Sequence, residues 1–316
     1  MLLRNLLKKE VNLMNKPKIY IDGQAGTTGL EIYSRLSERD DIEIIMIDPD
    51  KRKDNDERKK CMNEADLVFL CLPDAAAVEA MSLIEGNTKV IDASTAHRVN
   101  DDWAYGMREL SPDFYENIKS KQFIANPGCH ATGFIMAVYP LVNSGIISKD
   151  AYLSAFSLTG YSGGGKKMIA QYENDKTFDL EAPRIYGLTQ MHKHLPEMKK
   201  ICGLTYEPVF NPIVSDYYRG MATTISINDI SVDKVFNTLN DWYKDCPLIT
   251  VTKQEEGMIS ANTKANKDSL EIVITGNDQR VCVTSLFDNL GKGACGAAIQ
   301  NMNIMLGFEE TKGLNI

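Results

Sequence analysis

Short apolar segments alternate with helical patterns through the first half of the chain. Residues 18–22 and 42–48 are rich in β-branched and other apolar side chains, and residues 66–72 form a continuous apolar run between polar positions. Two shorter runs follow at 89–92 and 123–125. Continuous apolar strands are typical of a parallel sheet that is covered on both faces. The alternation therefore predicts an α/β domain with a doubly wound, Rossmann-type parallel sheet and right-handed crossovers.

The pattern changes from about residue 145, where longer runs alternate between apolar and polar positions. Such alternation predicts a second, α+β domain built on a mixed or antiparallel sheet with one covered face. The spacing of apolar residues predicts a helix at 232–244 and a final helix at 294–306, whose small residues favour close packing. The predicted strands are 152–159, 221–227, 271–274 and 280–286.

Length and composition agree with two globular domains. A chain of 316 residues is too long for one ordinary hydrophobic core. Its composition, 43% hydrophobic and 25% charged, is typical of a globular protein. The net charge of −8 argues against a nucleic-acid-binding protein, which would carry a basic face. No apolar run approaches the ~20 residues that cross a bilayer, so we expect no membrane segment. Seven cysteines without a CxxC pair indicate reduced thiols in a cytoplasmic protein, and neither a disulfide framework nor a metal site.

Residues 1–16 are basic and weakly amphipathic. Their apolar part is too short and interrupted for a secretory signal, and a second methionine, Met14, stands just before the first predicted strand. We therefore expect an N-terminal extension outside the fold. The favoured explanation is a translation start assigned too far upstream of the first strand, and the alternative is a targeting peptide.

A glycine-rich turn follows the first predicted strand. It carries Gly23, Gly26 and Gly29, and helical spacing resumes directly after it. Strand, glycine turn and helix are the context of a dinucleotide-binding site, where the backbone approaches a pyrophosphate at the helix N-terminus. The spacing GxxGxxG departs from GxGxxG, so a glycine turn without a ligand is the alternative. We predict that these glycines bind a cofactor together with Thr27 and Thr28.

The end of the second predicted strand carries two conflicting signals for the cofactor. Asp48 lies 19 residues beyond Gly29, where an acid would bind the adenosine ribose of NAD. Lys51 and Arg52 follow and could pair with the 2′-phosphate of NADP. We favour NADP(H), with Arg52 as the phosphate contact, because Asp48 could simply cap the turn. A solvated run of charges is the alternative for the basic residues.

The stretch around Cys129 carries the clearest chemical signal. Residues 126–128 form a tight turn between a strand and an apolar helical run at 134–142. Cys129 would then lie in the first helical turn, where unpaired N–H groups and the helix dipole can lower a thiol pKa from its usual ~8.5. We predict a thiolate nucleophile, with a small buried cysteine as the alternative. The adjacent His130 is expected to point away from Cys129 and not to act as its base.

Two of the four histidines, His192 and His194, lie two residues apart. On a strand they would share a face, and Pro196 predicts an extended segment before a helix at 197–201. Either histidine could serve as the acid/base for Cys129. A zinc site is the alternative, but no further Cys or His stands at ligand spacing.

Further polar segments are suited to binding an anion. Residues 160–167 form a loop rich in backbone N–H groups that ends in lysines, and its candidates are Ser162, Gly163 and Lys166; a plain hairpin turn is the alternative. Ser94 and Asn126 follow two predicted strands, at the edge where open α/β sheets bind ligands. With a nicotinamide cofactor, these residues would suit thiolate attack on an activated acyl group, followed by hydride reduction of the thioester.

Six stretches occur in the order of one known sequence pattern. They are residues 21–29, 71–74, 92–98, 126–129, 192–197 and 289–294. Together they resemble the N-acetyl-gamma-glutamyl-phosphate reductases of the shorter, second type, which are related to the aspartate-semialdehyde dehydrogenases. The resemblance covers residues 17–308. It implies NADPH-dependent reduction of N-acetyl-L-glutamyl 5-phosphate to the 5-semialdehyde with release of phosphate, in arginine biosynthesis.

The resemblance also implies roles for single residues and an assembly. Cys129 would be the nucleophile, His192 or His194 the acid/base, and Arg98 a contact of the substrate phosphate. Many relatives are expected to carry an aromatic residue where this chain has His130. The protein would form homodimers or homotetramers. The further implied cofactor contacts are Leu72, Pro73, Asn289 and Gly291.

We therefore expect a NADP-binding Rossmann domain at 17–128, a catalytic and dimerisation domain at 129–288, and a C-terminal helical segment at 289–316 that packs back on the first domain. The alternative enzyme is an aspartate-semialdehyde dehydrogenase or another acyl-phosphate reductase. The alternative outside enzymes is an NADP-binding regulator on the same scaffold.

Overall fold

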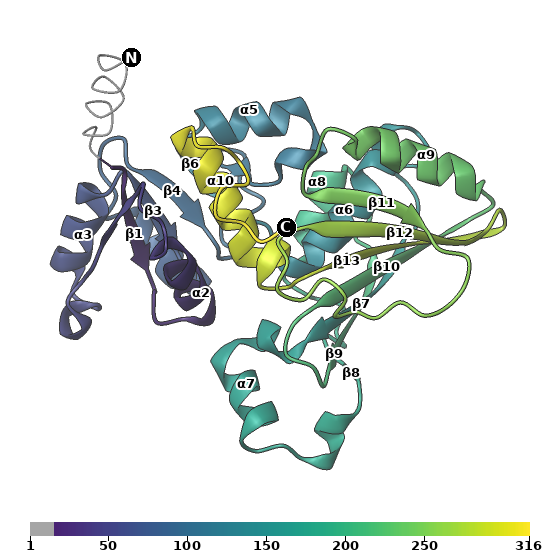
Figure 1. The fold of residues 1–316 in the computed structure, drawn as a ribbon, viewed down its shortest axis with the longest axis horizontal. Helices are drawn as coiled ribbons and strands as arrows, with labels where there is room; N and C mark the ends of the chain where they lie inside the picture. The colour runs from purple at the N-terminus through teal and green to yellow at the C-terminus, as the bar shows by residue number, and fades with distance from the viewer. Residues whose placement is uncertain (1–15) are drawn as a thin grey trace, which may run out of the picture.

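The computed structural model describes residues 16–316. The expected N-terminal extension lies outside these residues, apart from Lys16. Two sheets, each with its own helices, lie next to each other, and the last helix, α10 (Gly296–Leu306), lies between them (Figure 1). In the described part of the chain, no helix is both long enough and apolar enough to cross a membrane.

The first sheet has six strands, and all of its pairings are parallel, in the order β2-β1-β3-β4-β6-β5. This confirms the predicted Rossmann-type sheet. The predicted strand at 42–48 is shorter than expected, because a 3₁₀ turn with Pro49 in its first position follows it. The strands are β1 (Lys18–Asp22), β2 (Glu43–Ile45), β3 (Leu67–Leu70), β4 (Lys89–Asp92), β5 (Ala104–Tyr105) and β6 (Phe123–Ala125).

Helices and apolar side chains cover this sheet. The core of the first domain includes Ile19, Phe69 and Ile91 from three strands, and α10 adds Ile299 and Met302 to the same cluster. The C-terminal helix therefore packs on the first domain. The helices of this part are α2 (Thr27–Leu36), α3 (Asn55–Glu64), α4 (Asp74–Met81) and α5 (Pro112–Ser120), of which α3 and α5 had no counterpart in the sequence prediction.

The second sheet has seven strands in the order β11-β12-β13-β10-β7-β9-β8. The pairs β7–β9 and β11–β12 are parallel and the remaining pairs are antiparallel, which confirms the predicted mixed sheet. Sequence patterns missed three of these strands. The strands are β7 (Ser154–Gly160), β8 (Arg184–Ile185), β9 (Val209–Ser215), β10 (Met221–Asn228), β11 (Ile249–Lys253), β12 (Leu270–Asn277) and β13 (Arg280–Phe287).

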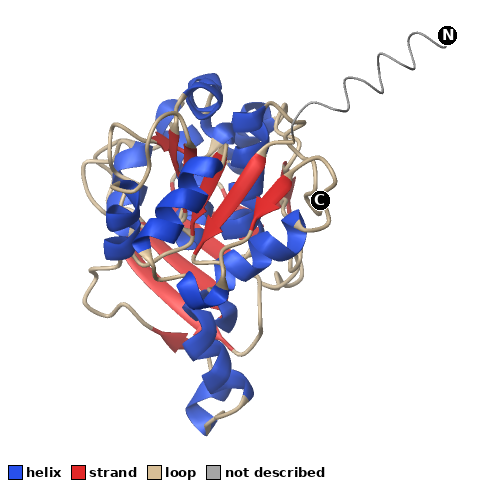
Figure 2. Ribbon diagram, turned by 90° about the vertical axis from the view of Figure 1, so that its left-hand side faces the viewer, coloured by secondary structure: helices blue, strands red, loops and turns tan. Residues whose placement is uncertain are grey.

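Three helices pack on one face of the second sheet: α6 (Cys129–Asn143), α8 (Leu195–Cys202) and α9 (Val232–Tyr243). Almost all of α6 is buried, and the Tyr243 hydroxyl of α9 donates a hydrogen bond of 2.6 Å to the Met136 carbonyl. A further helix, α7 (Gly165–Glu173), projects from the sheet as a lobe (Figure 2). Because α6 starts directly after the first sheet, the position of Cys129 is fixed by both domains.

Candidate active site

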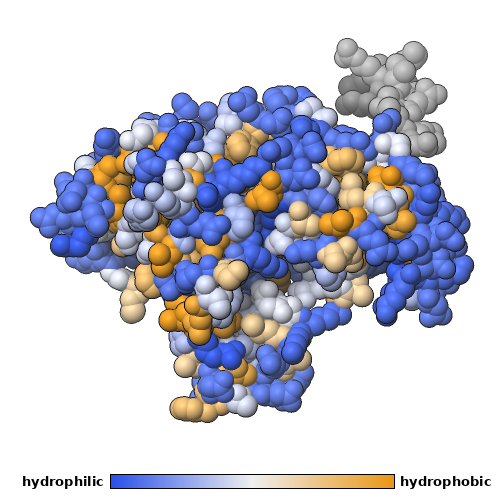
Figure 3. All heavy atoms as spheres, turned by 180° about the vertical axis from the view of Figure 1, so that it is seen from behind, coloured by the Kyte–Doolittle hydropathy of each residue, from blue (hydrophilic) through white to orange (hydrophobic). Residues whose placement is uncertain are grey.

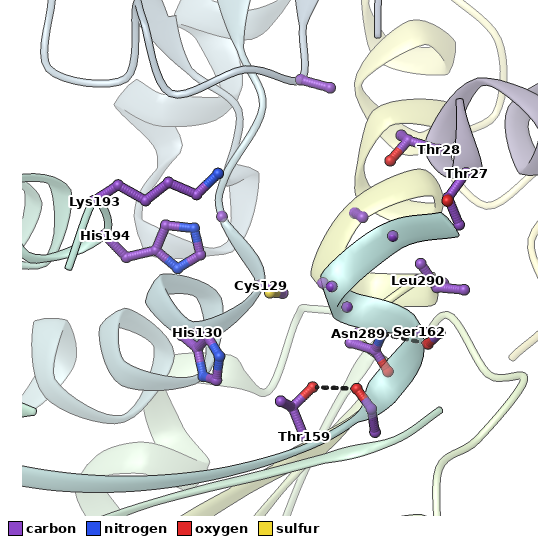
Figure 4. A pocket seen from close by; sticks show the side chains of 18 of the residues that line it. Thr27, Thr28, Cys129, His130, Thr159, Ser162, Lys193, His194, Asn289 and Leu290 are labelled. Atoms are coloured by element: carbon purple, nitrogen blue, oxygen red, sulfur yellow. Dashed lines mark hydrogen bonds between the residues drawn. The ribbon is translucent and has the colours of Figure 1, made fainter. Parts of the chain in front are cut away.

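A cavity of about 320 Å³ lies where the two domains meet. Thr27 and Thr28 line it from the first domain, and Cys129 lies between them and the side chains of Lys193 and His194 (Figure 4). None of the lining residues is an aspartate or a glutamate, although the chain carries a net charge of −8. This cavity therefore suits an anionic ligand better than a cationic one.

Gly128 and Cys129 form the turn at the centre of the cavity. Gly128 is the N-cap residue of α6, and its carbonyl accepts the Thr132 N–H at 2.8 Å. A Cβ atom added to Gly128 would lie 2.3 Å from Nη1 of Arg98, 2.5 Å from Nε2 of His194 and 2.6 Å from Oε1 of Glu197. Only glycine fits here, because three functional side chains converge on its α-carbon.

Glu197 binds this turn to α8. Its Oε1 pairs with Nη1 of Arg98 at 2.8 Å, and its Oε2 accepts hydrogen bonds from the Tyr105 hydroxyl at 2.8 Å and the Gly128 N–H at 3.2 Å. Glu197 is 1% exposed. Burial and the adjacent carboxylate raise the pKa of Tyr105 well above its usual value, so this phenol stays a donor.

Arg98 uses its other nitrogens to hold two strand ends. Nε donates to the Asn126 carbonyl at 2.9 Å and Nη2 to the Ala93 carbonyl at 3.0 Å. The guanidinium lines the cavity, but its charge is balanced by Glu197 and its donors bind the protein. Ser94 lies deeper, where its N–H and hydroxyl donate to the Asp92 carboxylate at 2.9 and 2.6 Å.

The pKa of the Cys129 thiol differs from the sequence prediction. Burial raises it above its usual value, and the charges of Arg98 and Lys193 and the His130 N–H offset only part of that increase. The prediction of a lowered pKa was wrong because it considered the helix terminus without desolvation. A nucleophilic Cys129 therefore needs a neighbouring base to accept its proton.

His194 and His192 lie in a turn that leads into α8. His194 is the N-cap residue, with φ −88° and ψ −10°, so the predicted extended segment was wrong. Pro196 is tolerated in the first turn of a helix, where no intrahelical N–H is needed. The two rings are 4.8 Å apart, and Nδ1 of His192 accepts the His194 N–H at 3.2 Å.

Both imidazoles are neutral near pH 7. Burial lowers the pKa of His192 to about 4, and burial together with the charge of Arg98 lowers the pKa of His194 well below its usual value. Nδ1 of His194 has no hydrogen-bond partner among the described residues, and its Nε2 lies 4.0 Å from Oε1 of Glu197. His194 is therefore in the form that accepts a proton, and the Glu197 carboxylate at 4.0 Å would offset part of the cost that burial and Arg98 impose on the resulting imidazolium.

His130 is bound on both sides of its ring. Its Nδ1 is 2.6 Å from the Ser157 hydroxyl and its Nε2 is 2.6 Å from the Tyr186 hydroxyl. Burial lowers the pKa of His130 to about 3. Because both nitrogens are engaged, His130 has no free position from which to take the Cys129 proton. Tyr186, which also lines the cavity, had no signal in the sequence.

The glycine-rich loop after β7 lines the cavity opposite the histidines. It folds as a 3₁₀ turn, Tyr161–Gly164, followed by α7, and Gly165 adopts φ +70°. The Ser162 hydroxyl accepts a hydrogen bond from the Asn289 side chain at 2.9 Å, so the loop is attached to the segment before α10. Ser162 and Gly163 line the cavity, whereas Lys166 does not.

The segment before α10 closes the cavity. It forms a π-helical turn, Gly291–Cys295, and a Cβ added to Gly293 would lie 3.1 Å from Cβ of Cys129. The Asn126 side chain donates to the Ala294 carbonyl at 3.0 Å. π-turns of this kind frequently occur at functional sites.

The glycine turn after β1 is built for close backbone approach. A Cβ on Gly23 would lie 2.3 Å from the Cys71 carbonyl oxygen, and one on Gly29 would lie 2.5 Å from the Gly23 carbonyl oxygen. Helix α2 begins after Gly26 with no side-chain cap and no acid in its first turn. Its free N–H groups therefore suit a pyrophosphate.

A second cavity, of about 600 Å³, lies beside this turn at the carboxyl end of β1, the strand next to which the strand order reverses. Gly23, Arg52, Lys53 and Leu72 line it. Asp48 does not line it; its carboxylate caps the following turn by accepting the Asp50 N–H at 3.0 Å. Lys51 pairs with Glu57 at 3.2 Å. Arg52 is thus the basic residue of the predicted pair that reaches this cavity.

The structure brings most of the predicted residues to these two cavities. Sequence analysis assigned no role to Tyr186, Lys193 or Glu197, although the last two stand within a quoted motif. In the described residues, no group of three or more His, Cys, Asp or Glu side chains could hold a metal ion. The predicted residues that line neither cavity are Gly26, Gly29, Pro73, Ser94, Lys166 and Gly291.

Comparisons with known proteins agree for both domains. Residues 18–118 match the family model for the NAD-binding domain of semialdehyde dehydrogenases, and residues 129–289 match that for their dimerisation domain. The chain is 42% identical over 322 residues to N-acetyl-gamma-glutamyl-phosphate reductase 2 of Nostoc sp., a match that covers 95% of this chain and 100% of the relative. It is 43% identical over 308 residues to the N-acetyl-gamma-glutamyl-phosphate reductase of Brucella anthropi, with 92% and 99% covered.

Two solved structures share the fold at low sequence identity. Aspartate semialdehyde dehydrogenase II from Vibrio cholerae, complexed with ASA, matches with a TM-score of 0.70 and 14% identity, over 93% of this chain and 99% of that one. Aspartate semialdehyde dehydrogenase from Candida albicans, solved with NADP, matches with a TM-score of 0.66 and 16% identity, over 92% and 98%. At these identities the likeness concerns the fold alone.

Proposed function

The chain belongs to the semialdehyde dehydrogenase family and, within it, to the N-acetyl-gamma-glutamyl-phosphate reductases, and we propose that Cys129 carries the acyl group in its reaction. The activity is the reduction of N-acetyl-L-glutamyl 5-phosphate to N-acetyl-L-glutamate 5-semialdehyde and phosphate, a step of arginine biosynthesis. The observation that carries the proposal is the Gly128–Cys129 turn, on which Arg98, His194 and Glu197 converge.

In the proposed first step, the Cys129 thiolate attacks the acyl carbon. A C–S bond forms, the C–O bond to the phosphoryl group breaks, and phosphate leaves. The location of Cys129 at the start of α6 supports this step, because no carboxylate lines the cavity that would receive the acyl phosphate. Ser162, Gly163 and Asn126 line the same cavity and are proposed substrate contacts.

We assign the acid/base role to His194 rather than to His192. His194 is 5% exposed and close to Gly128, and its Nδ1 is unpartnered in the described chain. As a neutral imidazole it would take the thiol proton and later protonate the oxygen of the reduced acyl group. Collapse of the resulting thiohemiacetal would then break the C–S bond, return that proton to His194 and release the aldehyde and the Cys129 thiolate. The Nδ1 of His192 instead accepts the His194 N–H, which supports a role in positioning His194.

The first domain binds NAD(P), and we propose NADP(H) as the cofactor. The glycine turn and the uncapped start of α2 fit a pyrophosphate, and Arg52 is available for a 2′-phosphate, while Asp48 is engaged in its own turn. Thr27, Thr28, Leu72 and Asn289 would complete the contacts. When bound, the cofactor supplies a hydride to the carbonyl carbon of the Cys129 thioester.

The dimerisation domain indicates a homo-oligomer, and we propose a homodimer or homotetramer. The face of the second sheet opposite the helices exposes Phe156, Ile185 and Val209. Seen from behind, apolar surface also gathers on the second domain just above the projecting α7 lobe (Figure 3). Large exposed apolar areas of this kind mark interaction sites.

An acylated amine is the better substrate for this cavity than a free one. Aspartate semialdehyde carries an ammonium group, which would enter a cavity lined by the ammonium of Lys193, unpaired among the described residues, and by no carboxylate. N-acetylation removes that positive charge. This observation favours the N-acetylglutamyl substrate over the aspartyl alternative.

The test is the reverse reaction, followed by NADPH absorbance. N-acetylglutamate semialdehyde and aspartate semialdehyde are compared, each with and without inorganic phosphate. We expect phosphate-dependent reduction of NADP with the acetylated aldehyde alone. Activity with aspartate semialdehyde alone would overturn the substrate assignment. Absence of activity with both aldehydes would favour a regulator on this scaffold.

A further inference from the structure

The charged side chains that line the cavity around Cys129 all carry a positive charge. Two lining side chains are permanent cations, Arg98 and Lys193, and no lining side chain is an anion. Arg98 is neutralised by Glu197 at 2.8 Å and binds two backbone carbonyls with its remaining nitrogens. Arg98 therefore presents little net positive charge to a ligand in the cavity.

Lys193 is different. No carboxylate of the described residues forms an ion pair with it; Glu197 pairs with Arg98, and Asp101 pairs with Lys200. Asp74, the carboxylate on which Lys193 acts electrostatically, accepts hydrogen bonds from the N–H and hydroxyl of Thr95. The Lys193 ammonium thus has no partner in the described part of the chain.

Lys193 is an exposed residue whose side chain also lines the cavity. It lies between His192 and His194, directly before α8, and its side chain extends past the His194 ring toward the turn that carries Cys129 (Figure 4). The charge of Lys193 lowers the pKa of Cys129, His192 and His194 alike. An ammonium that acts on all three groups lies within reach of whatever those groups bind.

We propose that Lys193 binds an anionic group of the substrate. The inference rests on the proposed function, in which the substrate has two such groups, the phosphoryl group that leaves and the carboxylate at the other end. Both are oxyanions that an ammonium binds through charge-assisted hydrogen bonds. Lys166, which sequence analysis favoured for this role, does not line the cavity.

The kinetic test uses Lys193→Ala, Lys193→Arg and the control Lys199→Ala, which removes an exposed lysine of α8. In the reverse reaction, KM is measured separately for inorganic phosphate and for N-acetylglutamate semialdehyde. We expect Lys193→Ala to raise one of these KM values roughly tenfold or more, with kcat changed less. A raised KM for phosphate identifies the phosphoryl group, and a raised KM for the aldehyde identifies the carboxylate.

Lys193→Arg should recover most of the lost affinity, because it retains the charge, and Lys199→Ala should match the wild type. Unchanged KM values in Lys193→Ala would overturn the proposal, and so would a fall in kcat alone. A fall in kcat alone would mean that Lys193 acts on the ionisation of the Cys129 thiol and not on substrate binding.

A second measurement does not depend on turnover. Alkylation of Cys129 by iodoacetamide is followed by peptide mass spectrometry, with inorganic phosphate or N-acetylglutamate as the protecting anion. We expect protection in the wild type and its loss in Lys193→Ala. If the wild type lacks reductase activity but shows this protection, the proposed function fails and the anion site stands. Equal protection in both proteins would overturn the site.

Discussion

The backbone N–H of Gly128 donates a hydrogen bond of 3.2 Å to the side chain of Glu197, although the two residues lie 69 positions apart. The same carboxylate pairs with Arg98, so one buried side chain joins the turn before Cys129, the end of β4 and the start of α8. The nucleophile and His194 are thus aligned by a residue that need not touch the substrate.

Replacing Glu197 with glutamine should destabilise the protein and lower its activity. The change leaves the Arg98 guanidinium buried without a counter-charge, and breaking such a pair costs about 3–5 kcal/mol. Thermal unfolding and kcat report the two effects. The exposed Glu207→Gln provides the control. An unchanged melting temperature in Glu197→Gln would show that Arg98 finds other compensation.

The reactivity of Cys129 in the free enzyme should increase with pH beyond the range of an ordinary thiol. Its pKa is raised by burial, so the thiolate fraction is small at pH 7 and grows only as the pH passes the usual value of ~8.5. The rate of iodoacetamide labelling of the Cys129 peptide, measured from pH 6 to 10, checks this. A midpoint near neutral pH would mean that the helix terminus dominates over burial.

His194→Asn should lower kcat by roughly 10²- to 10⁴-fold, the usual contribution of a general acid/base. His192→Asn should have a smaller effect, since His192 acts on the His194 backbone. Because the pKa of His194 is lowered, the wild-type enzyme should keep its base form well below pH 6.5. Steady-state kinetics of both variants below pH 6.5 decide which histidine is the acid/base. A larger loss of kcat in His192→Asn than in His194→Asn would reverse the assignment.

Arg52→Ala should weaken NADPH binding more than NADH binding, because only NADPH carries the 2′-phosphate. Lys51→Ala is the matched control, since Lys51 pairs with Glu57 and does not line the cofactor cavity. Dissociation constants from fluorescence titration give the comparison. Equal losses for both cofactors would refute the 2′-phosphate contact.

The sequence predicted the strands whose apolar runs are bounded by polar residues. For β1 and β4 the predicted first and last residues are those that the structure shows. It missed β9, where Asn211 and Pro212 interrupt the pattern of a strand. Pattern reasoning placed Cys129 at a helix start but predicted the wrong direction for its pKa, because burial depends on tertiary packing. Tyr186 and Lys193 were missed for the same reason: their position depends on which loops the second sheet brings to the cavity.

The central claim is that Cys129 carries the acyl group, and intact-protein mass spectrometry tests it most directly. The enzyme is incubated with N-acetylglutamyl phosphate in the absence of NADPH and quenched in acid, and Cys129→Ala and Cys282→Ala are treated in parallel. We predict one N-acetylglutamyl adduct on the wild type and on Cys282→Ala, located to the Cys129 peptide, and none on Cys129→Ala. An adduct that persists in Cys129→Ala, or turnover by that variant, would contradict a thioester at Cys129.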